Sequence, residues 1–205
     1  KSGKTKQLEH VKEYSVSPNQ EYVAVIQNNE GGTAIKLVSL SDLTVREVSL
    51  ESFELEYQQA VWNATGNTLG YYIFDKENKA YTIGCFKVDN LIREYKLDPI
   101  AIPDFPPGMH IIKSQLYVSD KGDKVFFDTQ QKDLASHENV KVWKSTDKEL
   151  PPKSKINYKV WNVWLPLEDK VYEIEQDQLK VCAITDNQEK AVLLDNEMYL
   201  PLYEY

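Results

Sequence analysis

The side chains that could do acid–base or nucleophilic chemistry are scattered along the 205 residues of the chain. The three histidines, His10, His110 and His137, lie far apart, each in a polar or proline-rich context that predicts a solvated loop. A catalytic histidine needs a nucleophile within hydrogen-bond reach, and no residue near these three suggests one. The nucleophile elbow Gly-x-Ser-x-Gly does not occur. The sequence therefore predicts no catalytic residue in this chain.

Metal and cofactor sites are not indicated either. Cys85 and Cys182 each lie in an apolar run, which is typical of buried thiols. A disulfide between them stays an open alternative, because the separation of two cysteines in sequence does not give their geometry. No Cys-x-x-Cys motif or Cys/His cluster occurs. The acidic pairs fall in turn-like segments without the spacing of a calcium loop, so we expect neither metal nor cofactor: Asp75/Glu77, Glu168/Asp169 and Asp186/Glu189.

Two segments could contact a substrate or a partner. The loop Asp98–Ile111 holds four of the nine prolines, so it cannot form an interior strand, and Phe105 lies within it. It is either a plain connection between two β-units or a binding lip. The polar stretch Gln130–Trp143, which contains His137, is either a solvated insertion or a second contact loop.

A dense aromatic group follows that stretch. Stacked rings can bind sugars or bases, whereas their alternation along predicted strands favours a buried core with some exposure at the rim. The group consists of Trp143, Tyr158, Trp161, Trp164 and Tyr172. The four residues that we name as candidate contacts to a substrate or partner are Phe105, His137, Trp143 and Trp164.

Composition and charge bound the class of protein. The chain is 41% hydrophobic, with 13 Tyr, 6 Phe and 4 Trp, which is enough for a folded core. Its 24 basic and 32 acidic residues give a net charge of −8, which argues against nucleic-acid binding. No apolar window is long enough for a membrane span. With Lys1 in first place and no signal-peptide pattern, we expect a piece of a longer protein.

An internal repeat sets the expected fold. The segments 16–25 (VSPNQEYVAV), 62–71 (WNATGNTLGY) and 118–127 (VSDKGDKVFF) each place turn formers before an apolar run. Ser17, Asn63 and Ser119 are equivalent, as are Gln20, Gly66 and Gly122. Ser and Asn side chains bond the backbone just ahead, and Gly supplies the positive φ of a tight hairpin. The repeat therefore predicts recurring hairpins.

A second hairpin follows each copy, with turns expected at Asp42, at Asp89-Asn90 and at Glu168-Asp169-Lys170. Each unit of about 40 to 60 residues then has four antiparallel strands, the size of a propeller blade. We predict one all-β domain over residues 1–205, a partial β-propeller of about four four-stranded blades in an incomplete ring. The blades are expected at about 10–52, 55–98, 110–175 and 176–205, the last incomplete. Its open sheet edges should pair with another copy or with missing blades.

The repeated core resembles a known kind of propeller. Ser17 to Ala24 (SPNQEYVA) is similar to the core of TolB-like and peptidase propellers. Residues 116–174 resemble, more specifically, the N-terminal propeller of bacterial prolyl oligopeptidase-family serine peptidases, which are dipeptidyl peptidase-like. The matching positions are Val140, Val142, Trp143, Asp147, Leu150, Pro151, Trp164, Leu165 and Lys170-Val171-Tyr172. The hydrolase half of that family is absent from the chain, so no triad residue is carried over.

The resemblance implies a function for the whole protein. The propeller would cover the active site of a downstream α/β-hydrolase domain and restrict entry to short peptide substrates, without supplying a nucleophile. It also implies a periplasmic or secreted location. A TolB- or WD-repeat-like scaffold that binds another protein is the alternative, and a domain that binds sugars through the aromatic group is a third. The substrate and the functional face stay open.

Overall fold

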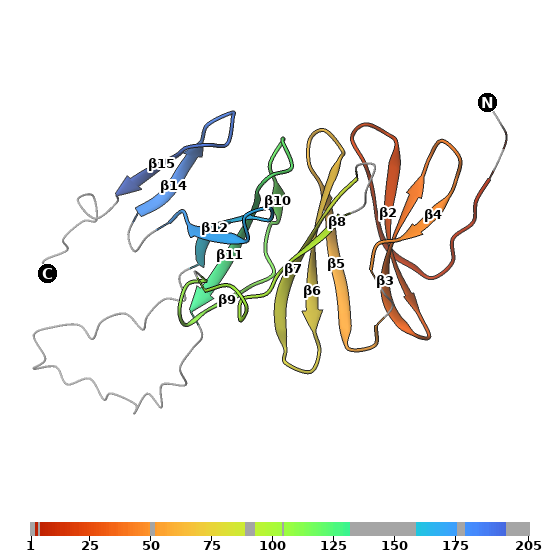
Figure 1. Cartoon of the computed structure of the whole chain (residues 1–205), viewed down its shortest axis with the longest axis horizontal. Helices are drawn as coiled ribbons and strands as arrows, with labels where there is room; N and C mark the ends of the chain where they lie inside the picture. The colour runs from red at the N-terminus through yellow and green to blue at the C-terminus, as the bar shows by residue number, and fades with distance from the viewer. Residues whose placement is uncertain are drawn as a thin grey trace, which may run out of the picture.

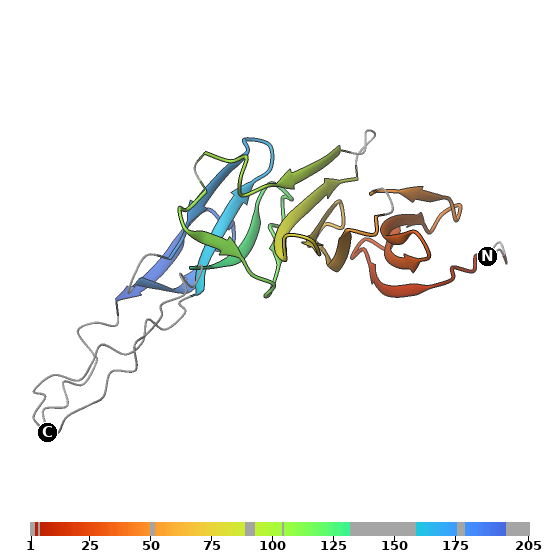
Figure 2. The same cartoon turned by 90° about the horizontal axis from the view of Figure 1, so that it is seen from below.

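The computed structural model describes residues 3, 5–49, 52–88, 93–103, 105–131, 159–175 and 179–195. Within these ranges the chain forms strands, turns and connections, and no helix. The strands assemble into four antiparallel sheets that stand side by side along the long axis (Figure 1). Figure 2 shows the same order of sheets from below. The predicted partial β-propeller is confirmed.

The first two sheets are four-stranded meanders with the strand orders β1-β2-β3-β4 and β5-β6-β7-β8. In each of these sheets the two central strands are eight residues long. They are buried because they carry apolar residues on both faces. The strands of the first sheet are β1 (Val11–Val16), β2 (Tyr22–Asn29), β3 (Gly32–Ser39) and β4 (Val45–Glu47). Those of the second are β5 (Leu55–Trp62), β6 (Thr68–Asp75), β7 (Ala80–Lys87) and β8 (Arg93–Leu97).

The third sheet departs from the expected four strands, because its innermost strand is split. Both β9 and β10 pair with β11, one at each end, and β12 and β13 complete the sheet. The fourth sheet is a two-stranded hairpin in the described residues. The bounds are β9 (Met109–Ile111), β10 (Tyr117–Val118), β11 (Val125–Gln131), β12 (Lys159–Leu165), β13 (Lys170–Glu173), β14 (Leu179–Ile184) and β15 (Ala191–Asp195).

Two apolar cores fill the spaces between the first three sheets. The first lies between sheets one and two and is built around Tyr57, Trp62 and Tyr71. The second lies between sheets two and three and includes Phe127 and Trp164. Strand alternation explains the division, because Tyr71 and Tyr72 are neighbours in β6 and point to opposite faces. The connection that follows β8 crosses from the second sheet to the third.

Candidate functional site

Four hairpin turns of one design lie at the same end of the four sheets. In each, the first residue's N–H donates to the carbonyl five residues ahead, and the fourth residue's N–H donates back to the first residue's carbonyl, at 2.7 to 3.0 Å. The fourth residue always has a positive φ, between 55° and 73°. The turns are 17–20, 63–66, 119–122 and 185–188.

The side chain of the first residue completes each turn. An oxygen of Ser17, Asn63, Ser119 or Thr185 accepts a hydrogen bond from the backbone N–H five residues ahead, at 2.9 to 3.1 Å. This is the local bonding that the sequence predicted for Ser17, Asn63 and Ser119, and it is confirmed. Because the bond is local, the turn type follows from the residues themselves.

The internal repeat found in the sequence included three of these turns and missed the fourth, which begins at Thr185. It carries Gln188 in the left-handed region in place of glycine, at a φ of 55°. The signal that could have found it is the shared triplet Asn-Gln-Glu, which follows both Ser17-Pro18 and Thr185-Asp186. The two Asn side chains also make the same contact, since Asn19 Nδ2 and Asn187 Nδ2 each donate to the Glu two residues ahead at 3.1 Å.

Each turn contacts the next one, so the turns form a row across the sheets. Asn19 Nδ2 reaches Gly66 O at 3.5 Å, and Asn63 Nδ2 donates to Asp120 O at 2.9 Å. Asp120 N in turn donates to Gln188 Oε1 at 2.9 Å. Packing along the row is close, because a Cβ added at Gly122 would lie 2.0 Å from Thr68 Oγ1. We call this set of four turns the turn row.

Two glutamates connect neighbouring sheets through backbone N–H groups, Glu13 in β1 and Glu175 just after β13. The carboxylate of Glu13 accepts from Gln59 N at 3.0 Å and Ala60 N at 3.1 Å, at the irregularity of β5 where Gln59 has a φ of 55°. The carboxylate of Glu175 accepts from Trp161 N at 3.2 Å and Val181 N at 3.1 Å. Backbone donors freed by an irregular strand are thus satisfied by a carboxylate.

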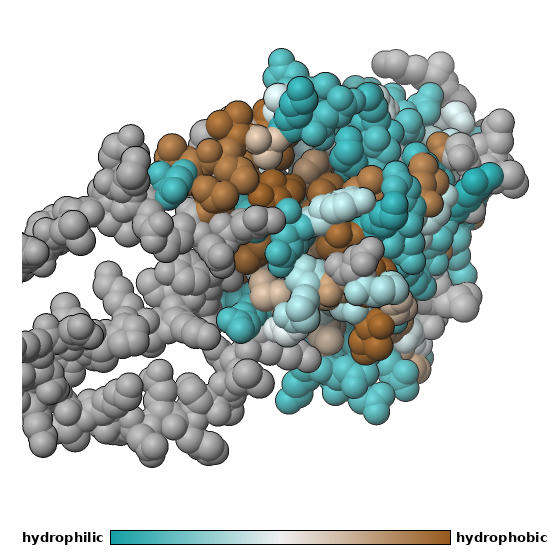
Figure 3. All heavy atoms as spheres, turned by 60° about the vertical axis from the view of Figure 1, so that its left-hand side comes forward, coloured by the Kyte–Doolittle hydropathy of each residue, from teal (hydrophilic) through white to brown (hydrophobic). Residues whose placement is uncertain are grey.

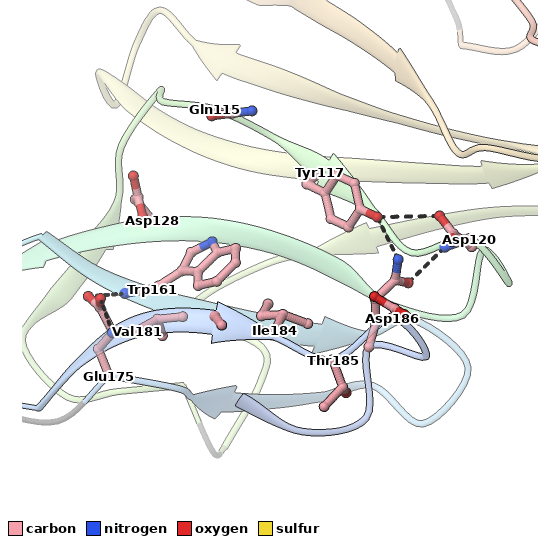
Figure 4. A pocket seen from close by; sticks show the side chains of 12 residues that line it. Gln115, Tyr117, Asp120, Asp128, Trp161, Glu175, Val181, Ile184, Thr185 and Asp186 are labelled. Carbon is pink, nitrogen blue, oxygen red and sulfur yellow. Dashed lines mark hydrogen bonds between the residues drawn. The ribbon is translucent and has the colours of Figure 1, made fainter. Parts of the chain in front are cut away.

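A cleft of about 950 Å³ lies between the third sheet and the hairpin β14–β15 (Figure 4). Trp161 and Tyr117 lie on the side of the third sheet, and both contact the ring of Phe126, with centroids 5.4 and 5.6 Å apart. The β14 side contributes Val181 and Ile184. The remaining lining residues are polar or small: Gln115, Asp120, Asp128, Glu175, Ala183, Thr185, Asp186 and Gln188.

The charged residues that line the cleft are all acidic. Four carboxylates line it and none of its lining residues is Lys or Arg. Glu175 is occupied by the backbone donors of Trp161 and Val181. Asp120 accepts from Tyr117 Oη at 3.3 Å, and burial together with the Asp120 charge raises the pKa of the Tyr117 phenol. No described residue donates a hydrogen bond to the carboxylates of Asp128 or Asp186. The cleft is therefore suited to a cation.

Of the four candidate contact residues, only Phe105 and Trp164 are described, and neither of them lines this cleft. His137 and Trp143 lie outside the described residues, as does the predicted turn Asp89-Asn90. Trp164 is completely buried in the second core, with no described hydrogen-bond partner for its indole N–H, and so presents no contact surface. Phe105 is partly buried and packs against the same core.

Two further expectations need correction or restriction. His110 was expected in a solvated loop, but it pairs with Gln130 in β9, and its Nδ1 is buried without a described partner. The proline-rich segment also ends in a strand, β9, which begins just after Gly108.

Cys85 is a free buried thiol, and burial raises its pKa to about 12. The side chain of Cys182 lies outside the description.

The described residues contain no group of three or more His, Cys, Asp or Glu side chains placed to hold a metal ion. Over the same residues, the structure has no helix with the length and apolar character needed to cross a membrane.

Asn63, the acceptor of the sequon Asn63-Ala64-Thr65, is buried, and its side-chain amide donates to Thr65, Asn67 and Asp120. The glycosylation pattern therefore lies in a structural turn.

Comparison with known proteins finds similarity only at the level of structure. No protein-family model and no curated protein matches the chain. Among solved structures it is similar to the β-propeller domain of the Trilobed protease from Pyrococcus furiosus, at 17% identity and a TM-score of 0.47 over 85% of this chain and 46% of that one. It is similar to the acylaminoacyl peptidase of Pyrococcus horikoshii, at 12% identity and a TM-score of 0.45 over 88% and 27%.

A putative TolB from Agrobacterium tumefaciens is also similar, at 12% identity and a TM-score of 0.40, over 82% of this chain and 50% of that one. The chain spans half or less of the length of these three structures.

Proposed function

We propose that this partial β-propeller is a non-catalytic domain that binds a polypeptide segment in the cleft between the third sheet and β14–β15. The observation that carries the proposal is the cleft itself, about 950 Å³ in volume, with aromatic rings on one wall and an excess of carboxylates. A cleft of this size accommodates a few residues of extended chain. The bound segment is expected to carry a positive charge, from a Lys or Arg side chain or a free amino terminus.

The physical reasons are charge and ring geometry. Asp128 and Trp161 are directly opposite each other in the pairing of β11 with β12, so they lie on the same face of the sheet. A cation held between a carboxylate and an indole gains both Coulomb attraction and a cation–π interaction, worth about 0.5 to 2 kcal/mol. Asp186 lines the opposite side of the cleft, in the fourth turn of the turn row.

In the whole protein, we propose that the domain gates access to an α/β-hydrolase domain of a serine peptidase that lies outside this chain. The support is the sequence resemblance over residues 116–174 together with a cleft suited to peptide. The domain would select and position short peptides and supply no nucleophile. A periplasmic or secreted location belongs to the same proposal.

The binding proposal is tested with a fluorescent pentapeptide that contains one Lys and a matched peptide with norleucine at that position. Fluorescence anisotropy should give a Kd at least tenfold lower for the Lys peptide, a difference of about 1.4 kcal/mol. The double variant D128N/D186N should weaken binding of the Lys peptide about tenfold and leave the norleucine peptide unchanged. Higher salt should reduce the difference between the peptides.

Asp42→Asn is the matched control, because Asp42 is an exposed carboxylate in a turn of the first sheet. It should not change binding. Equal affinity for the two peptides, or an equal effect of the Asp42 and Asp128/Asp186 changes, would overturn the proposal.

The alternative function is a scaffold that binds another folded protein, as TolB- or WD-repeat-like propellers do. The coding sequence beyond Tyr205 separates the two. A Gly-x-Ser-x-Gly motif followed by Asp and His supports the peptidase, whereas further blades alone support the scaffold.

A further inference from the structure

Three of the four carboxylates that line the cleft lie at its two ends. Asp128 lies at one end beside Trp161, because the two are directly opposite each other in the pairing of β11 with β12. Asp120 and Asp186 lie at the other end, in the third and fourth turns of the turn row. Figure 4 shows the same separation. The cleft therefore presents two negative positions along its length.

The strand register of the third sheet gives the distance between these two ends. Asp128 is two residues from Phe126, which is opposite Tyr117 in the pairing of β10 with β11. Asp120 follows Tyr117 by three residues in the direction of the turn row. The path along this wall is therefore five residues, or up to about 16 Å at about 3.3 Å per residue.

The opposite wall gives a similar distance. The carboxylate of Glu175 accepts from both Trp161 N and Val181 N, so Val181 lies at the end of the cleft away from the turn row. Asp186 follows Val181 by five residues, and the irregularity in β14 takes up one of them. The path along β14 is then roughly 13 Å. Both walls indicate that the two negative positions are about 13 to 16 Å apart.

Between its two ends the cleft has apolar walls. Tyr117 lies in β10 on one wall, where its ring contacts that of Phe126, and Ile184 ends β14 on the other wall. With the side of β14 and β15 turned forward, the molecule shows apolar surface bordered by hydrophilic residues (Figure 3). An apolar side chain of a bound segment would therefore be buried between two charged contacts.

The lysines next to the third turn do not neutralise the carboxylates of the cleft. Lys121 pairs with Glu189 at 3.4 Å, and Lys124 pairs with Asp123 at 3.8 Å. Within the described residues, the three carboxylates at the two ends of the cleft form no ion pair. Two cations of a ligand can therefore each pair with a free carboxylate.

We propose that the cleft selects a dibasic segment whose two cationic side chains are four residues apart, with an apolar residue midway between them. This inference rests on the proposed function and names the segment that the cleft binds. In an extended chain, residues i, i+2 and i+4 point to the same side, and i and i+4 are about 13 Å apart. One cation then lies beside Asp128 and Trp161, the other beside Asp120 and Asp186, and the apolar side chain beside Tyr117.

A closer pair of lysines does not fit the same two positions. Lysines two residues apart have their Cα atoms about 7 Å apart. They reach both ends of the cleft only by extending in opposite directions, which costs side-chain entropy. The spacing of the two cations, rather than their number, is therefore what the cleft distinguishes.

The test uses fluorescent heptapeptides of one composition with blocked termini, each with two lysines and one leucine among glycine and serine. In the first peptide the lysines are four residues apart and the leucine lies midway. In the second the lysines are two residues apart and the leucine lies outside them. Both carry the same charge, so general attraction to a chain of net charge −8 is equal. Fluorescence anisotropy should give a Kd about tenfold lower for the first peptide.

A third isomer separates the effect of the apolar residue from that of the lysines. Its lysines are four residues apart, and its leucine lies outside them. It should bind about threefold more weakly than the first peptide, and still more tightly than the second. Binding equal to that of the second peptide would show that the leucine, and not the spacing of the lysines, sets the preference.

Variants of the chain assign the two positions. Asp128→Asn removes one end, and the double variant D120N/D186N removes the other. Either change should bring the first and second peptides within about twofold, because only one lysine then has a carboxylate partner. Asp169→Asn and the double variant D42N/D169N are the matched controls. They remove the same numbers of charges from exposed residues outside the cleft, and should keep the tenfold preference.

Equal affinity of the native chain for the first two peptides would overturn the inference, and this comparison needs no variant. A preference that survives either change at the ends of the cleft would overturn it as well. If a single-lysine peptide still binds tenfold more tightly than its norleucine counterpart, only the spacing has failed. If lysine gives no advantage in any peptide, the proposed function fails too.

Discussion

The junction between the first two sheets is filled, whereas the junction between the third sheet and β14–β15 is open. At the filled junction, the ring of Tyr71 lies across Gly84 of the neighbouring strand, so closely that a Cβ there would be 2.2 Å from the ring. Its hydroxyl donates to Glu94 Oε1 at 2.6 Å. At the open junction, carboxylates and one partly buried indole face a hairpin of two strands.

The difference shows that the turn row and the packing between sheets are separate features. Both junctions carry equivalent turns with the same backbone hydrogen bonds. Both also carry a glutamate, Glu13 or Glu175, that accepts hydrogen bonds from two backbone N–H groups. The side chains between the sheets differ, and so does the number of described strands in the partner sheet. One design of turn can therefore hold two sheets together around either a core or a binding cleft.

The largest expected effect comes from truncating the two aromatic residues. Tyr71→Ala should lower the free energy of unfolding by about 3 to 5 kcal/mol, because it empties a closed core and leaves Glu94 without its donor. Trp161→Ala should cost only about 1 kcal/mol, mostly its contact with Phe126, and should weaken peptide binding. Urea unfolding of both variants measures the two changes in the free energy of unfolding. Equal costs would show that the two junctions are packed alike.

A smaller difference is expected for the two bridging glutamates. Glu13→Gln should lower the free energy of unfolding by about 2 kcal/mol, since an amide cannot accept both backbone N–H groups as a carboxylate does. Glu175→Gln should cost about 1 kcal/mol and act locally. Amide hydrogen exchange should show faster exchange at Val181 with Glu175→Gln, and at Ala60 with Glu13→Gln. An unchanged rate at Ala60 would contradict the bridging role of Glu13.

The smallest effects concern the left-handed residues of the first and fourth turns. Gln20→Gly should stabilise the chain by about 0.5 kcal/mol, because relief of the positive φ of 58° exceeds the added chain entropy. Gln188→Gly should instead cost about 1 kcal/mol, since it removes the contacts to Asp120 N and Tyr117 Oη. Thermal unfolding measures both. Effects of the same sign would mean that Gln188 does not link the turns.

The fold could be predicted from sequence because its determinants are local. Ser17, Asn63 and Ser119 form their turns through backbone groups within five residues, and the apolar runs that follow pair with neighbours in the chain. The split of the innermost strand into β9 and β10 was missed. It depends on how 112–116 meets the second sheet, where Gln59 Nε2 donates to Ser114 O at 3.0 Å.

The cleft could not be predicted in the same way. Asp128, Glu175 and Asp186 come from three separate elements, and nothing in their spacing brings them together. The sequence placed Asp186 in a solvated turn. It does lie in a turn, but that turn belongs to the turn row, and Asp186 therefore lines the cleft. The aromatic group was predicted only as a set. Trp161 faces the cleft and Trp164 the core because of strand register, which is fixed by pairing with β11.

Every sheet is made from strands that follow one another along the chain, and this bears on how the molecule is made. Loop closure between consecutive strands costs little entropy, so the first sheet can assemble as soon as its own residues have left the ribosome. Each later sheet then grows on a template that is already present. Under mechanical load from the ends, the same connectivity should release the sheets one after another rather than all at once.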